Sequence, residues 1–236
     1  HLVSCIGAST RSKESLRIVI EYMPRGSLDT LLRTYAPAGA LPTGLQLGFA
    51  LDTARAMKFL HGIGLIHGDL KPANLLVTEQ LQIKLTDFDT CKFLSPRMQG
   101  SMGTPAFIPP ELFKKQGYTQ KVDVYAFGIT LWQIATRAQP YADIDALAIP
   151  DAVLAGTRPP RLAGHALAPL MAACWAAKPH KRPAFELVVE QLEALDAQLA
   201  GGAHLHAHAH AHAQHAHAQS PPPHALDART RSRSYT

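Results

Sequence analysis

The feature that most constrains the fold is the order of its segments, because strand-like stretches come early and helical ones follow. Residues 16–22 alternate in polarity and are rich in β-branched side chains, which is typical of a strand. Two apolar stretches at 74–77 and 82–86 are four residues apart, and this spacing predicts a hairpin. After Gly117 helices are predicted near 119–136, 145–155, 166–176 and 184–199. This order favours an α+β fold.

Two further helices are predicted between the first strand and the hairpin. Ser27 follows a Pro24–Gly26 turn and is a plausible N-cap for a short helix that runs through Leu32. A longer helix should end near Gly62, because apolar residues precede it at helical spacing. Those apolar residues are Leu47, Leu51, Ala54 and Met57.

The composition changes at Gly201. Residues 1–200 have the composition of a folded domain, whereas 201–236 contain a His/Ala tract, three consecutive prolines and an Arg/Ser-rich end. Such low-complexity sequence has almost nothing to bury, so we expect 201–236 to be disordered. The alternative is weak Zn²⁺, Ni²⁺ or Cu²⁺ binding by the histidines, which lie on one side of the chain only when it is extended.

The charge and the cysteines exclude several classes of protein. The formal charge is +5, and the tail supplies +2 of it, from three arginines against one aspartate. The folded part therefore lacks the basic excess of a nucleic-acid-binding protein. Cys5, Cys91 and Cys174 are too widely spaced for a disulfide scaffold or a zinc site, and we expect them to be small buried side chains. Because no apolar run approaches a membrane span, we expect a cytoplasmic protein without one.

The chemistry is concentrated in residues 66–77 and 84–89. Asp69 could orient an incoming hydroxyl and accept its proton, and Lys71 could offset charge on a transferred phosphoryl group. Asn74 and Asp87 supply the hard oxygen ligands that Mg²⁺ prefers. The predicted helix and hairpin on either side of these loops would fix the four residues relative to one another, and such positioning supplies much of the catalysis of phosphoryl transfer.

These residues resemble the H-R-D-L-x-x-x-N and D-F-G patterns of eukaryotic protein kinases. Four other stretches resemble the family in the expected order across roughly 1–195. They are the hinge at 18–28, the end of the activation segment at 103–111, the buried helix that anchors the large lobe at 123–128, and Arg182 with the proline that follows it. In the family this arginine pairs with the activation-segment glutamate, which is Glu111 here.

The resemblance implies a protein-kinase-like fold that is mainly the helical large lobe. Its parts would be a partial small lobe at 1–22, the hinge at 21–26 and the large lobe at 27–200. By resemblance, the cofactors would be ATP, whose adenine binds at the hinge, and Mg²⁺. The substrates would be proteins with Ser or Thr acceptors. The residues that would contact the nucleotide are Ile20, Glu21, Met23, Ser27 and Leu76.

The resemblance also predicts the subtype. Lys71 followed by Pro72 is similar to serine/threonine kinases. The hinge sequence, together with Trp175 and Arg182, looks like the tyrosine-kinase-like group, whose members mostly phosphorylate Ser and Thr. The function predicted is therefore a serine/threonine protein kinase.

The chain departs from the family pattern in three places. No Gly-rich loop, strand lysine or partner-helix glutamate precedes Ile18, and the chain begins mid-pattern at His1, so we expect a fragment that binds nucleotide poorly by itself. Gly68 replaces the arginine that normally pairs with a phosphorylated activation segment. Asp89 replaces a glycine, which could shift the conformation of its loop.

Some roles have simpler alternatives. By resemblance, His67 is expected to pack and hydrogen-bond behind the site rather than act as a base. The resemblance also implies that Thr104 hydrogen-bonds the catalytic aspartate and favours Ser/Thr acceptors, so Ser95 and Ser101 are better phosphorylation candidates. Ser27 is expected to cap its helix rather than reach a ribose.

The rival to a kinase is a pseudokinase, a scaffold or binding module that keeps the fold without phosphotransfer. A metal-binding protein organised around the His tract is a more distant alternative, because it leaves residues 1–200 unexplained. The sequence does not predict the oligomeric state.

Overall fold

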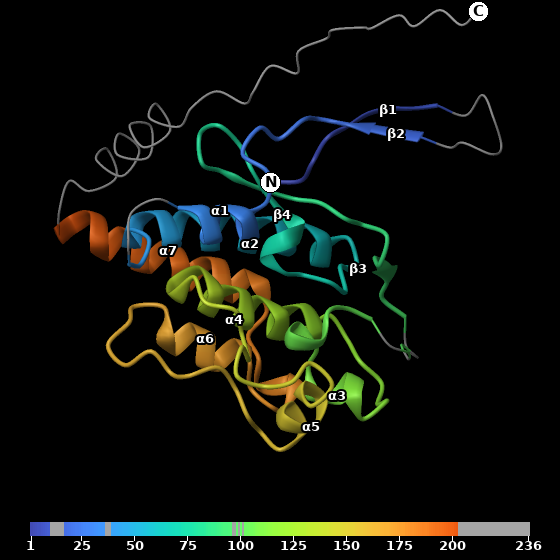
Figure 1. The fold of residues 1–236 in the computed structure, drawn as a ribbon. Helices are drawn as coiled ribbons and strands as arrows, with labels where there is room; N and C mark the ends of the chain where they lie inside the picture. Colours follow the sequence, from blue (N-terminus) through green and yellow to red (C-terminus); the bar gives the residue numbers. More distant parts are fainter. Residues whose placement is uncertain (10–16, 36–38, 96–97, 99, 101, 203–236) are drawn as a thin grey trace, which may run out of the picture.

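The computed structural model describes residues 1–9, 17–35, 39–95, 98, 100 and 102–202. Figure 1 shows a helical body with a β ribbon at its upper side. The low-complexity tail lies outside the described residues from 203 onward, as do Arg97 and Ser101 of the activation segment.

The strands of the described part form three two-stranded antiparallel ladders. These are β1 (Cys5–Ser9) with β2 (Arg17–Ile20), β3 (Leu65–Ile66) with β6 (Lys92–Phe93), and β4 (Leu75–Val77) with β5 (Ile83–Leu85). The expected strand and hairpin are confirmed as β2 and as β4–β5. Sequence reasoning missed β1, whose Gly7, Ala8 and Ser9 have low strand propensity and pair only because β2 lies beside them.

The helices are α1 (Leu28–Thr34), α2 (Thr43–Gly62), α3 (Pro110–Phe113), α4 (Lys121–Thr136), α5 (Ile149–Leu154), α6 (Ala168–Cys174) and α7 (Phe185–Gly202). The described residues also form short 3₁₀ turns, which are η1 (Pro72–Asn74), η2 (Pro105–Phe107) and η3 (Pro179–Lys181). Every helix predicted from apolar spacing is present, and the mixed content confirms the α+β fold class. Ser27 caps α1, since its hydroxyl accepts the N–H of Thr30.

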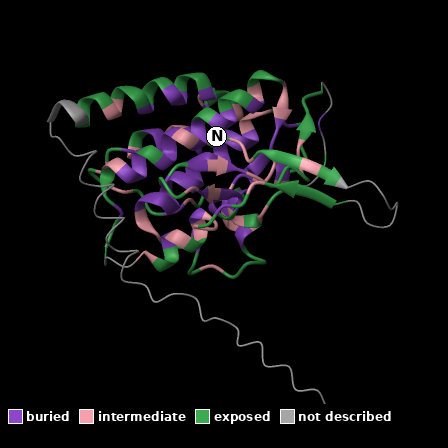
Figure 2. Cartoon of the chain, turned by 90° about the horizontal axis from the view of Figure 1, so that it is seen from above, coloured by how far each residue is buried: buried purple, intermediate pink, exposed green. Residues whose placement is uncertain are grey.

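The centre of the body is α4, which is buried around its whole circumference from Val122 to Ala135. A helix that is apolar on all sides must be surrounded by other elements. Figure 2 shows the buried residues gathered in the interior of the helical body. Gly128 lets α6 approach α4 closely, because a Cβ at residue 128 would lie 2.9 Å from Cys174 Cβ.

A buried ion pair joins the start of α3 to the chain before α7. Arg182 Nη1 and Nη2 donate to the two carboxylate oxygens of Glu111 at 2.6 and 2.8 Å, and both side chains are almost fully buried. The guanidinium also lies over the ring of Tyr125. The pairing expected for these two residues is confirmed, and it anchors the end of the activation segment to the helical body.

The β1–β2 ribbon leaves apolar side chains in contact with solvent, among them Ile6, Ile18 and Val19. All three cysteines are free thiols. Cys174 is buried and Cys91 is half-buried, but Cys5 is exposed on β1, so the expectation of a buried side chain was wrong there. Within the described ranges, none of the helices combines the length and the apolar character needed to cross a bilayer.

Candidate active site

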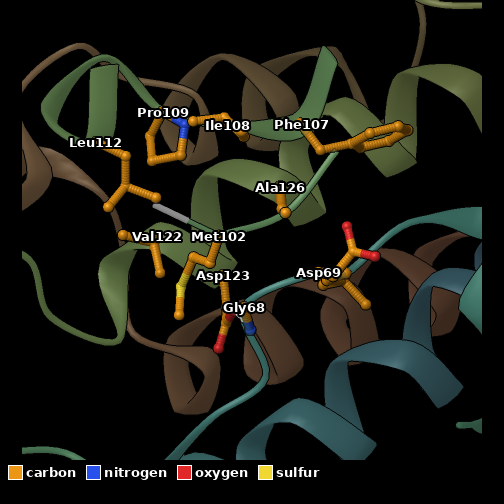
Figure 3. Close-up of a pocket in the computed structure, with 12 residues that line it drawn as sticks. Gly68, Asp69, Met102, Phe107, Ile108, Pro109, Leu112, Val122, Asp123 and Ala126 are labelled. Atoms are coloured by element: carbon orange, nitrogen blue, oxygen red, sulfur yellow. Dashed lines mark hydrogen bonds between the residues drawn. The ribbon is translucent and has the colours of Figure 1, made fainter. Parts of the chain in front are cut away.

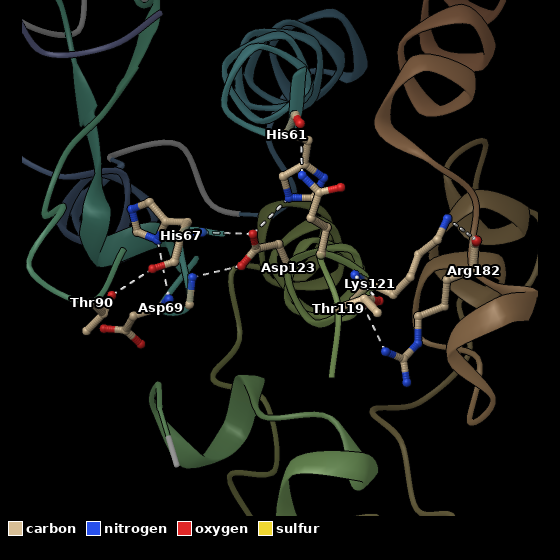
Figure 4. Close-up of polar contacts among 10 residues, drawn as sticks. His61, His67, Asp69, Thr90, Thr119, Lys121, Asp123 and Arg182 are labelled. Atoms are coloured by element: carbon tan, nitrogen blue, oxygen red, sulfur yellow. Dashed lines mark hydrogen bonds and ion pairs between the residues drawn. The ribbon is translucent and has the colours of Figure 1, made fainter. Parts of the chain in front are cut away.

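The loop from His67 to Lys71 connects β3 to η1, and its backbone is hydrogen-bonded to a side chain of α4. Asp123, in the first turn of α4, is 1% exposed and accepts the N–H groups of His67 and Gly68, each at 2.9 Å. The His61 ring, at the end of α2, contacts the same carboxylate at 2.9 Å. Figure 4 shows Asp123 between His61 and the loop. Its two oxygens therefore fix the backbone that leads into Asp69.

The Asp69 carboxylate is oriented by two side chains. Lys71 Nζ donates to Asp69 Oδ2 at 2.5 Å and to Thr104 Oγ1 at 2.6 Å. The Thr104 hydroxyl in turn donates to Asp69 Oδ1 at 2.8 Å. Each carboxylate oxygen thus accepts at least one side-chain hydrogen bond, and the expected bond between Thr104 and Asp69 is confirmed. Charge-assisted hydrogen bonds of this kind hold a carboxylate firmly in one orientation.

Asn74, in η1, is buried and faces the same carboxylate. Its Nδ2 donates to the backbone carbonyl of Asp69 at 2.8 Å and to Asp69 Oδ2 at 3.3 Å. This arrangement leaves the Oδ1 of Asn74 without a hydrogen-bond partner among the described residues. The side chain is therefore oriented with its acceptor oxygen available.

Asp87 lies at the same end of the β4–β5 hairpin as Asn74. The N–H of Thr86 donates to the carbonyl of Asn74 at 3.0 Å, and Asp87 is the next residue. Its φ is +65°, a left-handed conformation that aspartate tolerates better than most residues. The carboxylate is exposed and makes no hydrogen bond or ion pair within the described part of the chain.

Asp89 needs no unusual backbone conformation. It lies in a turn closed by the N–H of Cys91 and the carbonyl of Phe88 at 3.0 Å, and it is not among the described residues with positive φ. Glycine's conformational freedom is therefore not required at this position.

His67 is fully buried and its ring serves as a spacer between loops. The N–H of Asp69 donates to His67 Nδ1 at 3.3 Å, so the proton of the neutral ring lies on Nε2 and is donated to the carbonyl of Thr86 at 3.1 Å. With both nitrogens engaged, the ring has the packing and hydrogen-bonding role that the family resemblance implies.

Gly68 and Gly103 allow the activation segment to lie directly against the catalytic loop. A Cβ at Gly68, whose φ is +82°, would lie 2.9 Å from the sulfur of Met102. A Cβ at Gly103 would lie 2.8 Å from the Gly68 carbonyl oxygen. Figure 3 shows Met102 beside Gly68 in the small pocket under the segment. This close approach places Thr104 within reach of Asp69.

The predicted nucleotide-contacting residues lie at the end of β2, in the segment that joins β2 to α1, and in β4. Ser27 and Leu76 form an isolated β-bridge, and Met23 is buried while Ile20 is largely exposed. The Glu21 carboxylate accepts Lys84 Nζ at 2.7 Å and the Ser4 N–H at 2.7 Å, and these contacts lower its pKa. Its side chain is therefore committed to protein contacts, and Ser27 is committed to capping α1.

The backbone of the same segment is less engaged. The carbonyl of Glu21 and the N–H of Met23 make no hydrogen bond to the described residues. The segment between β2 and α1 thus has a backbone acceptor at Glu21 and a backbone donor at Met23 that no described residue uses.

Sequence reasoning missed three residues that organise the site. The sequence pattern indicates Asp123 only as part of a buried helix, although a carboxylate in an apolar helix is itself a signal of a buried hydrogen-bond role. Thr90, whose hydroxyl donates to the His67 carbonyl, and Met102 gave no sequence signal, because their importance depends on contacts between separate loops. No cluster of three or more His, Cys, Asp or Glu side chains suited to a metal occurs among the residues described.

Comparison of the sequence with known proteins identifies similar protein kinases. The family model described as protein tyrosine and serine/threonine kinase matches residues 1–192. A probable LIM domain-containing serine/threonine-protein kinase of Dictyostelium discoideum is 42% identical over 82% of this chain and 30% of its own length. The serine/threonine/tyrosine-protein kinase HT1 of Arabidopsis thaliana is 40% identical over 80% of this chain and 49% of its own length.

The chain thus spans less than half the length of these relatives. The matched region includes both functional loops and the activation segment, so the kinase-like fold predicted from the sequence is confirmed. The chain belongs to the protein tyrosine and serine/threonine kinase family.

Proposed function

We propose that the protein carrying this domain transfers the γ-phosphoryl group of Mg·ATP to serine or threonine hydroxyls of other proteins. The observation that supports it most strongly is the orientation of Asp69 by Lys71 and Thr104. A carboxylate that is fixed in this way, and still reachable from solvent, suits the task of orienting a hydroxyl and accepting its proton.

Lys71 has two roles in this proposal. Its Nζ bridges Asp69 and Thr104, which fixes the end of the activation segment relative to the catalytic loop. The same ammonium group lies beside the carboxylate where negative charge would develop on a transferred phosphoryl group. Positioning and charge compensation of this kind supply most of the catalysis of phosphoryl transfer.

Asn74 and Asp87 are the proposed ligands of Mg²⁺. The available Oδ1 of Asn74 and the unpaired carboxylate of Asp87 are hard oxygen donors, so the residues present fit this ion. Mg²⁺ is usually held by one or two carboxylates together with substrate phosphates, and when bound it neutralises phosphate charge. The backbone hydrogen bond between Thr86 and Asn74 at the end of the hairpin, with Asp87 next in the chain, supports this pairing of ligands.

The adenine would contact the segment between β2 and α1. The free carbonyl of Glu21 and the free N–H of Met23 offer an acceptor and a donor to a planar base. Ile20, Met23 and Leu76 would line the adenine pocket with apolar side chains. Because the Glu21 carboxylate and the Ser27 hydroxyl already have protein partners, we propose that Glu21 contacts the nucleotide through its backbone and that Ser27 acts by shaping the segment.

Two observations support serine and threonine as the residues that receive the phosphoryl group. The bridge to Asp69 contains Lys71 and Thr104, two residues that by family resemblance favour serine and threonine as acceptors. The Dictyostelium relative is also named a serine/threonine-protein kinase. The cytoplasmic location predicted from the sequence is part of this proposal, and the three free thiols agree with a reducing compartment.

The test is phosphoryl transfer by the full-length protein from γ-labelled Mg·ATP to a generic Ser/Thr substrate. Asp69→Asn should lower turnover by about 10²–10⁴-fold at nearly unchanged nucleotide affinity, because an amide cannot take the proton. Asp87→Asn should instead raise the Mg²⁺ requirement, because it removes a charged ligand.

Asp143→Asn is the matched control, since that carboxylate is exposed and distant in sequence from both loops. Equal and mild effects of the Asp69 and Asp87 substitutions would favour the pseudokinase, a module that binds without transferring phosphate.

A further inference from the structure

The loop that carries Asp87 has fixed ends and a middle that needs its own support. Residues 86–91 join β5, which pairs with β4, to β6, which pairs with β3. The two ladders are separate, so strand pairing does not determine the path of the residues between them. Contacts made by the loop itself must therefore decide where Asp87 lies relative to Asp69.

His67 contacts this loop on both sides of Asp87. Before Asp87, the ring Nε2 donates to the carbonyl of Thr86 at 3.1 Å. After Asp87, the ring meets Phe88 edge to face, with centroids 5.9 Å apart. Beyond that, the Thr90 hydroxyl donates to the His67 carbonyl at 2.7 Å, a bond drawn in Figure 4.

The bond from Thr90 is distinctive for two reasons. Of the described side chains in 87–91, that of Thr90 makes the only hydrogen bond to the catalytic loop. The carbonyl that it satisfies belongs to a fully buried residue whose N–H is held by Asp123 at 2.9 Å. A buried carbonyl without a partner is costly, so the hydroxyl stabilises this contact between loops specifically.

We propose that Thr90 is a positioning residue whose hydroxyl holds the Asp87 loop against the catalytic loop and thereby sets the Mg²⁺ ligand relative to Asp69. The bond clamps the turn of Phe88 to Cys91, which follows the left-handed Asp87 directly. Without it, the Thr86 contact and the Phe88 ring would hold only the first half of the loop. This inference rests on the proposed function of the site, and it adds a residue that neither functional motif contains.

The test compares Thr90→Val, which removes the hydroxyl and keeps the branched shape, with Thr90→Ser, which keeps the hydroxyl. Thr136→Val is the matched control, because Thr136 also donates to a backbone carbonyl but lies at the end of α4. The first measurement is the Mg²⁺ concentration that gives half-maximal phosphoryl transfer in the full-length protein. The second is hydrogen exchange of the Cys91 amide without nucleotide, which needs no activity.

We expect Thr90→Val to raise the half-saturating Mg²⁺ concentration about three- to tenfold, as the loss of one hydrogen bond to a buried carbonyl implies. The Cys91 amide should exchange faster, because the turn from Phe88 to Cys91 loses its hydrogen bond to the catalytic loop. Thr90→Ser should keep the half-saturating Mg²⁺ concentration and the Cys91 exchange rate of the unmodified protein. Thr136→Val should change neither of these two quantities.

An unchanged Mg²⁺ requirement in an active Thr90→Val protein would overturn the proposal. So would equal behaviour of the Val and Ser variants, or a Cys91 amide whose exchange does not change. If the unmodified protein transfers no phosphate, the proposed function fails, and the exchange measurement alone decides whether Thr90 holds the loop.

Discussion

The sulfur of Met102 lies beside the backbone of Gly68, where a side chain at residue 68 would begin. A Cβ on Gly68 would be 2.9 Å from this sulfur and 3.3 Å from the carbonyl oxygen of Thr90. Met102 and Met98 are both buried, in an apolar cluster that also contains Ile66, Ile108, Leu112, Tyr118 and Val122. The described part of the activation segment is thus held to the helical body by apolar burial.

This packing predicts that activity depends little on phosphorylation of the segment. Burial of a methionine side chain contributes about 1.5–3 kcal/mol, and Gly68 offers no cation for a phosphate to meet. The variant Ser95→Ala/Ser101→Ala should therefore keep the initial rate of the full-length protein within a few-fold, before and after phosphatase treatment. A large loss on dephosphorylation that the double variant no longer shows would mean that another basic cluster binds the phosphate.

Restoring an arginine at position 68 should not activate the protein. Gly68 has a φ of +82°, which costs other residues on the order of 1–3 kcal/mol, and its Cβ position is occupied by Met102. We expect Gly68→Arg and Gly68→Ala to lower both the melting temperature and the rate. Gly164→Ala separates the two causes, because Gly164 also has positive φ (+73°) but an open Cβ position. If both alanine variants lose the same stability, the contact with Met102 contributes nothing.

The hydroxyl of Thr104 should matter for turnover more than for nucleotide binding. Thr104→Val removes a donor to Asp69 Oδ1 and an acceptor for Lys71 Nζ. We expect the turnover number to fall about tenfold or more, because the general base loses its orientation, whereas Thr104→Ser should retain most of it. Steady-state kinetics with varied ATP is the measurement. A rise in the KM for ATP at constant turnover would place Thr104 in nucleotide binding instead.

Breaking the pair of Arg182 and Glu111 should destabilise the domain strongly. Glu111→Gln leaves a fully buried guanidinium without its carboxylate, and removal of one partner from such a pair costs about 3–5 kcal/mol. Denaturant unfolding measures the loss. Glu193→Gln is the control, because its pair with Arg55 is solvent-exposed and worth about 1 kcal/mol or less. A loss at Glu111 no larger than that at Glu193 would contradict a structural role for the buried pair.

The three cysteines should react with alkylating reagents in a defined order. Burial, together with Asp123, Asp87 and Asp89, raises the pKa of Cys91 to about 11, and burial raises that of Cys174 further. The reactive thiolate of Cys91 is therefore scarce at neutral pH and increases only as the pH approaches 11. Exposed Cys5 should be modified first, then Cys91, then Cys174, as followed by mass spectrometry. Early modification of Cys91 at pH 7 would indicate that its loop opens.

Local pattern was sufficient for most of the secondary structure and for the identity of the proposed catalytic groups. The helices from α4 to α7 follow from apolar spacing, and Ser27 caps α1 as its residue type predicts. Asp69, Lys71 and Asn74 could be named because their chemistry depends on residue type and short spacing along one loop. Even the pair of Glu111 and Arg182 could be anticipated, although only from the family resemblance.

Only the tertiary structure decided which atoms these groups contact. Nothing in the local sequence of Glu21 shows that Lys84 donates a hydrogen bond to its carboxylate. The local sequence of Thr90 also does not show that its hydroxyl donates to the His67 carbonyl. The effect of Gly68 likewise depends on Met102, which reaches it from another segment. Side-chain type and backbone propensity are properties of neighbouring residues, whereas a hydrogen bond between two loops exists only once the core has brought the loops together. The sequence by itself therefore determined most of the elements and the reactive groups, and the packing around α4 determined their partners.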